Sequence, residues 1–469
     1  MPTRRESQVA ALLTRIPVAA LGVVIAASAL QASCNGQTDD DGLTDAGRAD
    51  GAGADASGAD SPSEDSRADR ADGMSYGDGY GKEDAPAGVC TPGKQRCSGD
   101  SVETCGPKGE AWGSPVACGS EAPVCLNGAC LPLSEDGGAI TPSSCLPGGS
   151  GMSDCGPGGH GTESCCASLD VPMGSYYRTY ANSGSGPTGE ADTASVSELR
   201  LDKYLVTVGR FRQFVTAWDG GEGFLPAEGA GKHAHLNGGQ GLLNSADIDA
   251  GTTYEPGWTS SDNGTVQPTN TNLACGGSFT TWTSAPGSHE SLPITCVNWQ
   301  EAYAFCIWDG GFLPSESEWE YAAAGGDEQL EYPWGGATPG ADNQYMIYGN
   351  GGAGATGDCY YPSGKLEACT GVANIAPVGT PALGAGRWGQ LDLLGELDEW
   401  TLDWAAGYVD PCVDCAYLTP TPYGWVVRGG SFSPDSTLLS PPARSNAVVS
   451  SPQQSYRAPY IGFRCARTP

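Results

Sequence analysis

Cysteines are the side chains of this chain with the most evident chemical potential, since 19 of them occur among 469 residues. Cys412 and Cys415 have the Cys-x-x-Cys spacing of thiol–disulfide oxidoreductases, in which a low-pKa thiolate attacks a partner disulfide. That chemistry needs the motif beside a strand–helix pattern, whereas here it lies in a proline-rich segment. We therefore expect a structural disulfide between Cys412 and Cys415, and another that closes a loop between Cys359 and Cys369.

Three glutamates at alternate positions, Glu316, Glu318 and Glu320, could supply the acid pair of a glycosidase. Two of them fall in the first turn of a predicted helix, where the helix dipole stabilises carboxylates. A structural role is therefore favoured over catalysis.

Histidine is rare, and its four positions are His160, His233, His235 and His289. His233 and His235 could present two imidazoles to a metal ion, but no third ligand is evident and the surrounding segment is glycine-rich. We expect solvated loop histidines.

The elements that would position these residues are marked by helix caps. Thr207 can cap a helix whose apolar side chains from Val208 to Trp218 share one face. Asn298 and Ser315, each followed three residues later by glutamate, predict two more helices through the capping-box pattern. Short strands and long glycine-rich loops follow, so we expect an α+β domain with much irregular structure.

The start of the chain predicts export. Basic residues precede an uncharged apolar run over 16–30, which is short for a transmembrane helix. This layout is typical of a signal peptide, which we place at residues 1–33. The residues before Cys34 resemble a bacterial lipobox, which predicts lipidation of Cys34 and an outer-membrane or cell-surface lipoprotein. A cleaved signal and a freely secreted protein remain the alternative.

The region after Cys34 divides into three parts. Residues 34–86 form an acidic, solvated tether, with 14 acidic and 4 basic residues between positions 35 and 85. Residues 87–133 hold six cysteines and few aliphatic side chains, so disulfides, with zinc as the rival, must stabilise this module. A Gly/Pro-rich linker over 134–164 then leads to a large domain at 165–469. The net charge of −32 argues against nucleic-acid binding.

The large domain resembles the formylglycine-generating enzyme (sulfatase-modifying factor) family. The resemblance is carried by seven blocks in the family's order, among them Gly-Phe-Leu-Pro-Ser-Glu-Ser-Glu-Trp-Glu-Tyr-Ala-Ala at 311–323 and Val-Arg-Gly-Gly-Ser-Phe at 427–432. The other blocks lie at 202–209, 293–299, 332–335, 395–400 and 461–465. The resemblance implies a C-type-lectin-related fold and a disulfide between Cys306 and Cys465.

Enzymes of this family oxidise a sulfatase cysteine to formylglycine with O₂ and a copper ion held by two cysteines. Counted from Gly430, the two cysteine positions are occupied here by Pro434 and Leu439, and Asp398 replaces the active-site tryptophan, although Ser431 is retained. Proline and leucine offer copper no soft ligand. The resemblance therefore implies a domain without the oxidase centre. The family's sulfoxide synthases, which use histidines from a separate domain, are not matched either.

A structural calcium site of the family is better preserved. Its ligands would be the carboxylates of Asp392 and Glu399 and the carbonyls of Gly395 and Leu397, a hard-oxygen set that suits Ca²⁺. A second family site maps near Asn343, but Thr370 stands near its aspartate position.

Three functions remain open from the sequence. The favoured one is a non-catalytic module that binds an unknown protein or glycan at the cell surface, with specificity in the long insertions over 219–287 and 349–370. The alternatives are a formylglycine-generating oxidase with other ligands, and a partner subunit for such an oxidase. Free thiols in the folded domain would favour the oxidase.

Overall fold

The computed structural model describes residues 92–97, 101–119, 124–126, 129–131, 141–146, 155–156, 158, 161, 163–247, 252–350, 357–432, 439–446 and 455–469. The predicted signal peptide and tether, Cys34, His160 and Pro434 lie outside these ranges. Within them, no helix combines the length and the apolar composition that a membrane crossing requires.

The cysteine-rich module is built from short antiparallel strands. They are β1 (Gln95–Cys97), β2 (Ser101–Thr104), β3 (Val116–Ala117), β4 (Val124–Leu126) and β5 (Ala129–Leu131). β2 lies between β1 and β3, while β4 and β5 pair with each other. Cys118 bonds to Cys130, and Cys105 also belongs to a disulfide. For these three cysteines, disulfides rather than zinc are confirmed.

The large domain contains three α-helices within its described residues: α1 (Val208–Trp218), α2 (Trp299–Trp308) and α3 (Glu316–Ala324). Each begins after its predicted cap, because Thr207, Asn298 and Ser315 each accept a hydrogen bond from the amide three residues further on. The last two form complete capping boxes. Gly325, with a φ of 67°, ends α3 in the left-handed conformation that glycine adopts at little cost.

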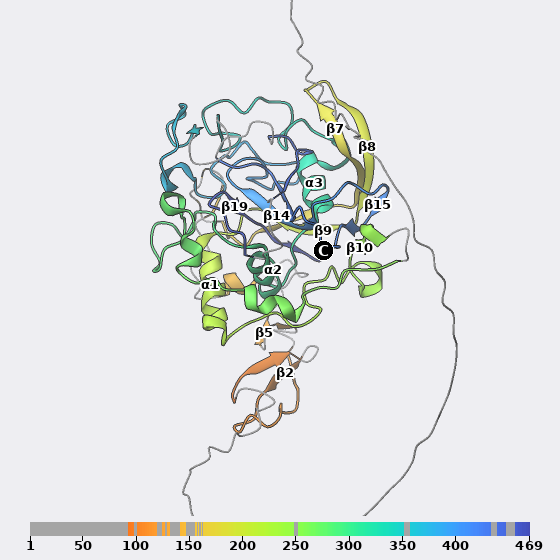
Figure 1. Ribbon diagram of the computed structural model, residues 1–469, viewed down its shortest axis with the longest axis vertical. Helices are drawn as coiled ribbons and strands as arrows, with labels where there is room; N and C mark the ends of the chain where they lie inside the picture. Colours follow the sequence, from red (N-terminus) through yellow and green to blue (C-terminus); the bar gives the residue numbers. More distant parts are fainter. Residues whose placement is uncertain are drawn as a thin grey trace, which may run out of the picture. The chain divides into compact units, whose positions relative to one another are not determined.

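The central sheet has the strand order β18–β17–β14–β19. Its strands are β14 (Asp398–Trp404), β17 (Trp425–Arg428), β18 (Ser445–Asn446) and β19 (Ile461–Gly462). β14 runs antiparallel to β17 and parallel to β19, and α3 packs against β14 and β17 (Figure 1). Six of the seven residues of β14 are buried, as expected for a strand covered on both faces.

Two smaller sheets flank this core. The first has the order β20–β9–β6, from β6 (Ser168–Val171), β9 (Leu199–Asp202) and β20 (Ala466–Arg467). In the second, β7 (Gly174–Asn182) and β8 (Pro187–Val196) form a long hairpin, drawn in yellow in Figure 1, that β15 (Cys412–Val413) extends. Alternate residues of β7 are buried, so one face of the hairpin covers the core.

Further short strands lie in the loops: β10 (Leu243–Asn244) pairs with β16 (Cys415–Ala416), and β11 (Gly349–Asn350), β12 (Asp358–Cys359) and β13 (Glu367–Ala368) pair in order. Most of the remaining backbone is irregular. The predicted α+β architecture, with much irregular structure, is confirmed.

All twelve cysteines from Cys145 onward are paired. The pairs are Cys145–Cys166, Cys155–Cys165, Cys275–Cys296, Cys306–Cys465, Cys359–Cys369 and Cys412–Cys415. The last three of these were predicted and are confirmed. The first two fasten positions within the predicted linker to the start of the large domain.

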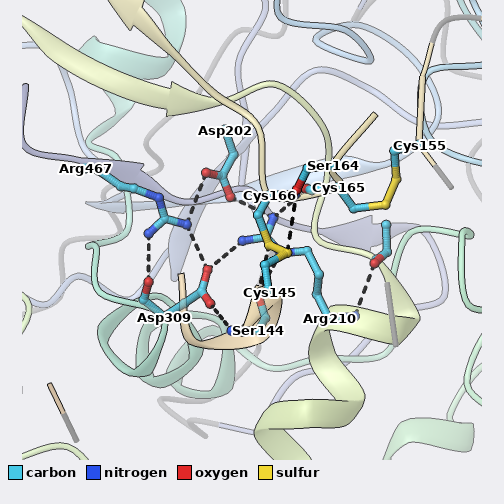
Figure 2. Close-up of a disulfide and its surroundings, with 11 residues drawn as sticks. Ser144, Cys145, Cys155, Ser164, Cys165, Cys166, Asp202, Arg210, Asp309 and Arg467 are labelled. Carbon is cyan, nitrogen blue, oxygen red and sulfur yellow. Dashed lines mark hydrogen bonds and ion pairs between the residues drawn. A yellow bond between two sulfur atoms is a disulfide. The ribbon is translucent and has the colours of Figure 1, made fainter. Parts of the chain in front are cut away.

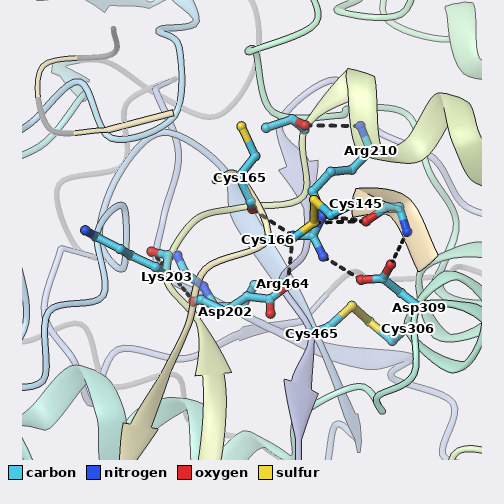
Figure 3. A network of polar contacts seen from close by, with 12 residues as sticks. Cys145, Cys165, Cys166, Asp202, Lys203, Arg210, Cys306, Asp309, Arg464 and Cys465 are labelled. Atoms are coloured by element: carbon cyan, nitrogen blue, oxygen red, sulfur yellow. Dashed lines mark hydrogen bonds and ion pairs between the residues drawn. A yellow bond between two sulfur atoms is a disulfide. The ribbon is translucent and has the colours of Figure 1, made fainter. Parts of the chain in front are cut away.

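A buried ionic network lies beside the Cys145–Cys166 bond. Arg210 donates to Asp202 at 2.9 Å and to Asp309 at 2.6 Å, and Arg467 donates to Asp309 at 2.8 Å (Figure 2). The amide of Ser144 donates to the other oxygen of Asp309 at 2.8 Å. Figure 3 shows Asp202, Arg210 and Asp309 of this network, with the Cys306–Cys465 bond close by. Two arginines balance two aspartates, which is the condition under which buried ions are tolerated.

Candidate functional site

The residues that the resemblance assigns to an oxidase centre lie at the start of β14 and on the segment after β17. Asp398 begins β14, and the amide of Phe432, next to Ser431, donates to the carbonyl of Glu396 at 2.9 Å. Ser431 is buried, while Leu439 is half-buried and packs against the apolar cluster that includes Leu393. Leu439 therefore supplies hydrocarbon and Asp398 a carboxylate.

Three of the four predicted calcium ligands, Asp392, Gly395 and Leu397, precede β14, and the fourth, Glu399, is the second residue of that strand. One oxygen of Asp392, Oδ2, accepts from the Gly379 amide at 2.7 Å, while Oδ1 is buried without a hydrogen-bond partner among the described residues. Both oxygens of Glu399 accept instead from Arg464, at 2.7 and 2.8 Å. Asp392 therefore keeps a free ligand oxygen, whereas the carboxylate of Glu399 is neutralised by a guanidinium group.

A second free carboxylate oxygen comes from Glu396, which the sequence analysis did not select. Its Oε1 accepts from the Ala376 amide at 2.8 Å, and its buried Oε2 has no partner among the described residues. Burial raises the pKa of Glu396 well above its usual value, with a further contribution from Asp392. Burial also raises the pKa of Asp392 to about 6.

These two carboxylates suit a hard cation, since a bound positive charge would offset the cost of ionising both in a buried site. No group of three or more His, Cys, Asp or Glu residues in the described ranges is arranged to hold a metal ion. A calcium ion here would consequently depend on backbone carbonyls, as predicted for Gly395 and Leu397.

His233 is fully buried, so the expectation of a solvated loop histidine is wrong for this residue. Its Nδ1 lies 3.0 Å from Glu255 Oε2, and its Nε2 lies 3.0 Å from Glu318 Oε2. Both ring nitrogens must be protonated to donate to two carboxylates. Burial alone would lower the pKa of His233, but Glu318 and Glu255 raise it to about 10. The ring is thus an imidazolium at neutral pH.

No local pattern could have revealed this group of three, because the partners lie 22 and 85 residues from His233 in the chain. The sequence analysis considered Glu318 as a helix-capping residue and as part of a glycosidase acid pair, but not as a partner of His233, and it did not select Glu255. His235 is half-buried, and because both ring nitrogens of His233 contact carboxylates, His233 has no free nitrogen with which to share a metal ion with His235.

Glu316 and Glu320 form ion pairs with arginines, of which Arg428 is buried and Arg444 is half-buried. Arg428 donates to Glu316 at 2.9 Å and to Glu320 at 2.6 Å, and Arg444 donates to both oxygens of Glu316 at 2.6 and 2.7 Å. Burial raises the pKa of Glu316 less than the two arginines lower it, whereas burial raises the pKa of Glu320 to about 8. The glutamates therefore connect α3 to β17 and to the 439–446 segment.

A sequence model of the sulfatase-modifying factor enzyme 1-like domain matches residues 158–469, most of the chain. The chain belongs to this family. The matched range begins close to the predicted domain start at residue 165, within the segment that the Cys155–Cys165 bond closes.

Two curated proteins and one solved structure illustrate what this chain is similar to. The formylglycine-generating enzyme of Thermomonospora curvata is 28% identical over 306 residues, which are 62% of this chain and 88% of that enzyme. The inactive C-alpha-formylglycine-generating enzyme 2 of Mus musculus is 36% identical over 112 residues, 24% of this chain and 32% of that protein. The solved structure of PvdO from Pseudomonas aeruginosa is 18% identical with a TM-score of 0.38, covering 64% of this chain and 94% of that one.

Proposed function

We propose that this chain is an exported bacterial lipoprotein whose sulfatase-modifying-factor domain binds a ligand or partner at the cell surface and does not oxidise cysteine. The observation that carries the proposal is the state of the cysteines. All twelve from Cys145 to Cys465 are in disulfides, so the domain offers no pair of thiolates. Thiolates are the soft ligands that select Cu(I), and positioning a substrate does not replace a missing redox metal.

Two side chains at the expected oxidase centre support the same proposal. Leu439 has no donor atom for copper, and Asp398 places a carboxylate where the resemblance predicts an indole. The tether and the cysteine-rich module would hold the domain away from the membrane. The ligand is an unidentified protein or glycan, and calcium would have a structural role at Asp392.

The alternative is a formylglycine-generating oxidase that uses other copper ligands. It is favoured by the similarity to the Thermomonospora curvata enzyme, which extends over 88% of that enzyme. Such an oxidase would need a thiolate pair from outside the domain, or nitrogen and oxygen ligands in place of sulfur.

An aldehyde assay separates the two functions. The purified chain is incubated with copper, O₂ and a peptide that carries the sulfatase-type Cys-x-Pro-x-Arg motif, and formylglycine is measured by mass spectrometry. We expect no product above a copper-only control, while an active formylglycine-generating enzyme run in parallel gives product. Aldehyde formation by the chain would overturn the proposal.

A double variant tests whether the scaffold could still hold the metal. Pro434→Cys with Leu439→Cys restores the two thiols at the positions that the resemblance assigns. We expect this variant to bind Cu(I) and the unmodified chain not to bind it. Equal Cu(I) binding by both proteins would point to other ligands and to the oxidase.

A further inference from the structure

A cavity of about 350 Å³ lies at one end of the central sheet. The residues at the positions of the family's oxidase centre lie at the other end. Residue pairing along β14 and β17 places Glu399 opposite Arg428 at one end and Trp404 opposite Trp425 at the other. The cavity is lined at this second end, whereas Asp398 and Ser431 adjoin the first. The two places are therefore separated by the length of β14.

Tryptophans form one wall of this cavity. Trp299 stacks on Trp425 with ring centroids 4.9 Å apart and an angle of 13° between the planes. The ring centroid of Trp404 lies 4.3 Å from that of Trp425. All three line the cavity, and Trp404 is only half-buried. Aromatic faces carry partial negative charge, so a wall of indoles attracts cations as well as apolar groups.

Two buried acceptors without partners lie in the same lining. Glu255 and Gln300 are 2% and 1% exposed, and in each the Oε1 atom has no hydrogen-bond partner among the described residues. The other oxygen of Glu255 accepts from His233 Nδ1 at 3.0 Å and from the Leu242 amide at 3.2 Å. A buried acceptor left unpaired is costly, which makes these two atoms candidates for contact with a ligand.

The charge around Glu255 is not balanced. His233 carries one positive charge between the carboxylates of Glu255 and Glu318, so the three side chains together retain one negative charge. Nearby Asp262 also lines the cavity. A ligand that enters would satisfy this environment best with a positive charge and several N–H donors.

We propose that this cavity binds an organic primary ammonium ion, with its N–H groups donating to Glu255 and Gln300 and its carbon skeleton against the tryptophan wall. Trp425 Nε1 is a buried donor without a partner in the described residues, so a hydroxyl or carbonyl oxygen on the same ligand would be accommodated. A quaternary ammonium ion would meet the aromatic wall but leave both acceptors unpaired. A neutral sugar would leave the negative charge unmatched.

The cavity combines a charged side chain from an insertion with aromatic side chains from the core of the domain. Glu255 lies in the long insertion over 219–287, whereas the tryptophans belong to the core of the domain. The insertion therefore adds a charged side chain to an aromatic surface of the common scaffold. The inference deepens the proposed binding role, but its test is separate from the aldehyde assay, so either can fail alone.

Calorimetric titration of the full chain with matched probes tests the proposal. Glucosamine and glucose share a ring and differ in an ammonium against a hydroxyl group, and 1,4-diaminobutane carries ammonium groups without a ring. We expect 1:1 binding of glucosamine, diaminobutane or both, at least tenfold tighter than glucose and weakened by salt. Glucose binding as tightly as the two amines, or no binding by any of the three, would overturn the proposal.

Variants locate the binding. Glu255→Gln should weaken amine binding at least tenfold, while Glu367→Gln, which removes the same charge from an exposed position on β13, should leave it unchanged. Equal loss in both would mean non-specific attraction to an acidic protein and would refute the site. If Glu255→Gln does not fold, Gln300→Met and Trp404→Leu, checked for an unchanged melting curve, must weaken binding instead.

Discussion

Most charged side chains buried in this domain contact a group of opposite charge. Arg210 contacts Asp202 and Asp309, Arg464 contacts Glu399, and His233 lies between two carboxylates. Removing one member of such a group leaves an uncompensated buried charge, which costs far more than the intact pair contributes. The titration of single residues should therefore be visible in the stability of the whole domain.

The pH dependence of unfolding should report the imidazolium of His233. Its pKa in the folded chain, about 10, lies above the usual 6.5, so its stabilising contribution is complete below pH 6.5 and is lost as pH rises through 10. Over that window this one proton can change the free energy of unfolding by at most about 1.4 kcal/mol per pH unit. Urea denaturation of the oxidised chain at pH 7 to 10 measures the slope.

His233→Gln should flatten that slope and lower the stability at pH 7, because two buried carboxylates then face each other without a cation. His289→Gln is the control. Nδ1 of the half-buried His289 ring lies 2.8 Å from the Thr281 carbonyl oxygen, and no ion pair joins this ring to a carboxylate among the described residues, so the variant removes a histidine without removing a buried ion pair. Identical slopes for the unmodified chain and His233→Gln would mean that the ring is not charged.

Calcium removal should destabilise the domain if Asp392 and Glu396 hold the ion. A ligand present at about 100 times its dissociation constant adds about 2.7 kcal/mol to the folded state. A chelator should therefore lower the melting temperature of the unmodified chain and of Glu367→Gln, but not that of Asp392→Asn. An unchanged melting curve in excess chelator, with no calcium found by elemental analysis, would exclude the site.

Local elements of this fold were predictable, and long-range groups were not. The three helix starts could be predicted from the capping residues Thr207, Asn298 and Ser315, because a cap and its hydrogen-bond partner lie within four residues of each other. The Cys306–Cys465 pair was found only through family resemblance, since its members are 159 residues apart. Glu255 and Glu396 were missed because burial without a partner is a property of the folded chain and has no signature in sequence.

We expect the Cys306–Cys465 disulfide to stabilise the folded chain more than the Cys359–Cys369 disulfide does. It joins α2 to the residue before β20 and closes a loop of 159 residues, whereas Cys359–Cys369 closes one of 10. The chain-entropy relation gives about 5 kcal/mol for the long loop and about 3 kcal/mol for the short one. We therefore expect the double alanine variant of Cys306 and Cys465 to lose more unfolding free energy than the double alanine variant of Cys359 and Cys369.

Urea unfolding of the two double variants provides the measurement. Both remove buried sulfur atoms, so the cost of the cavity is similar and the difference reports mainly loop length. Equal losses of stability in the two variants would argue that strain or residual structure in the unfolded chain outweighs the loop entropy.

At the scale of the whole chain, the distribution of charge separates two kinds of segment. The described domain pairs most of its buried charges, whereas residues 35–85 carry 14 acidic and 4 basic residues in a background of small side chains. We propose that a segment of this composition, with too few apolar side chains for a core, remains solvated. That composition suits a spacer between an anchor and a binding domain.

The anchor itself is the prediction on which this arrangement depends. A basic start, an apolar run over 16–30 and the sequence Ala-Ser before Cys34 predict cleavage at Cys34 and its modification with diacylglycerol. A pair of acyl chains binds a bilayer far more stably than one chain, because each buried CH₂ contributes about 0.8 kcal/mol. Expressed in a bacterium, the chain should therefore partition into the detergent phase, and Cys34→Ser should move it to the aqueous phase while leaving the domain folded. Mass spectrometry of the mature N-terminus decides between the alternatives: a lipidated Cys34 supports the anchor, and an unmodified N-terminus downstream of Cys34 would make the protein a freely secreted one.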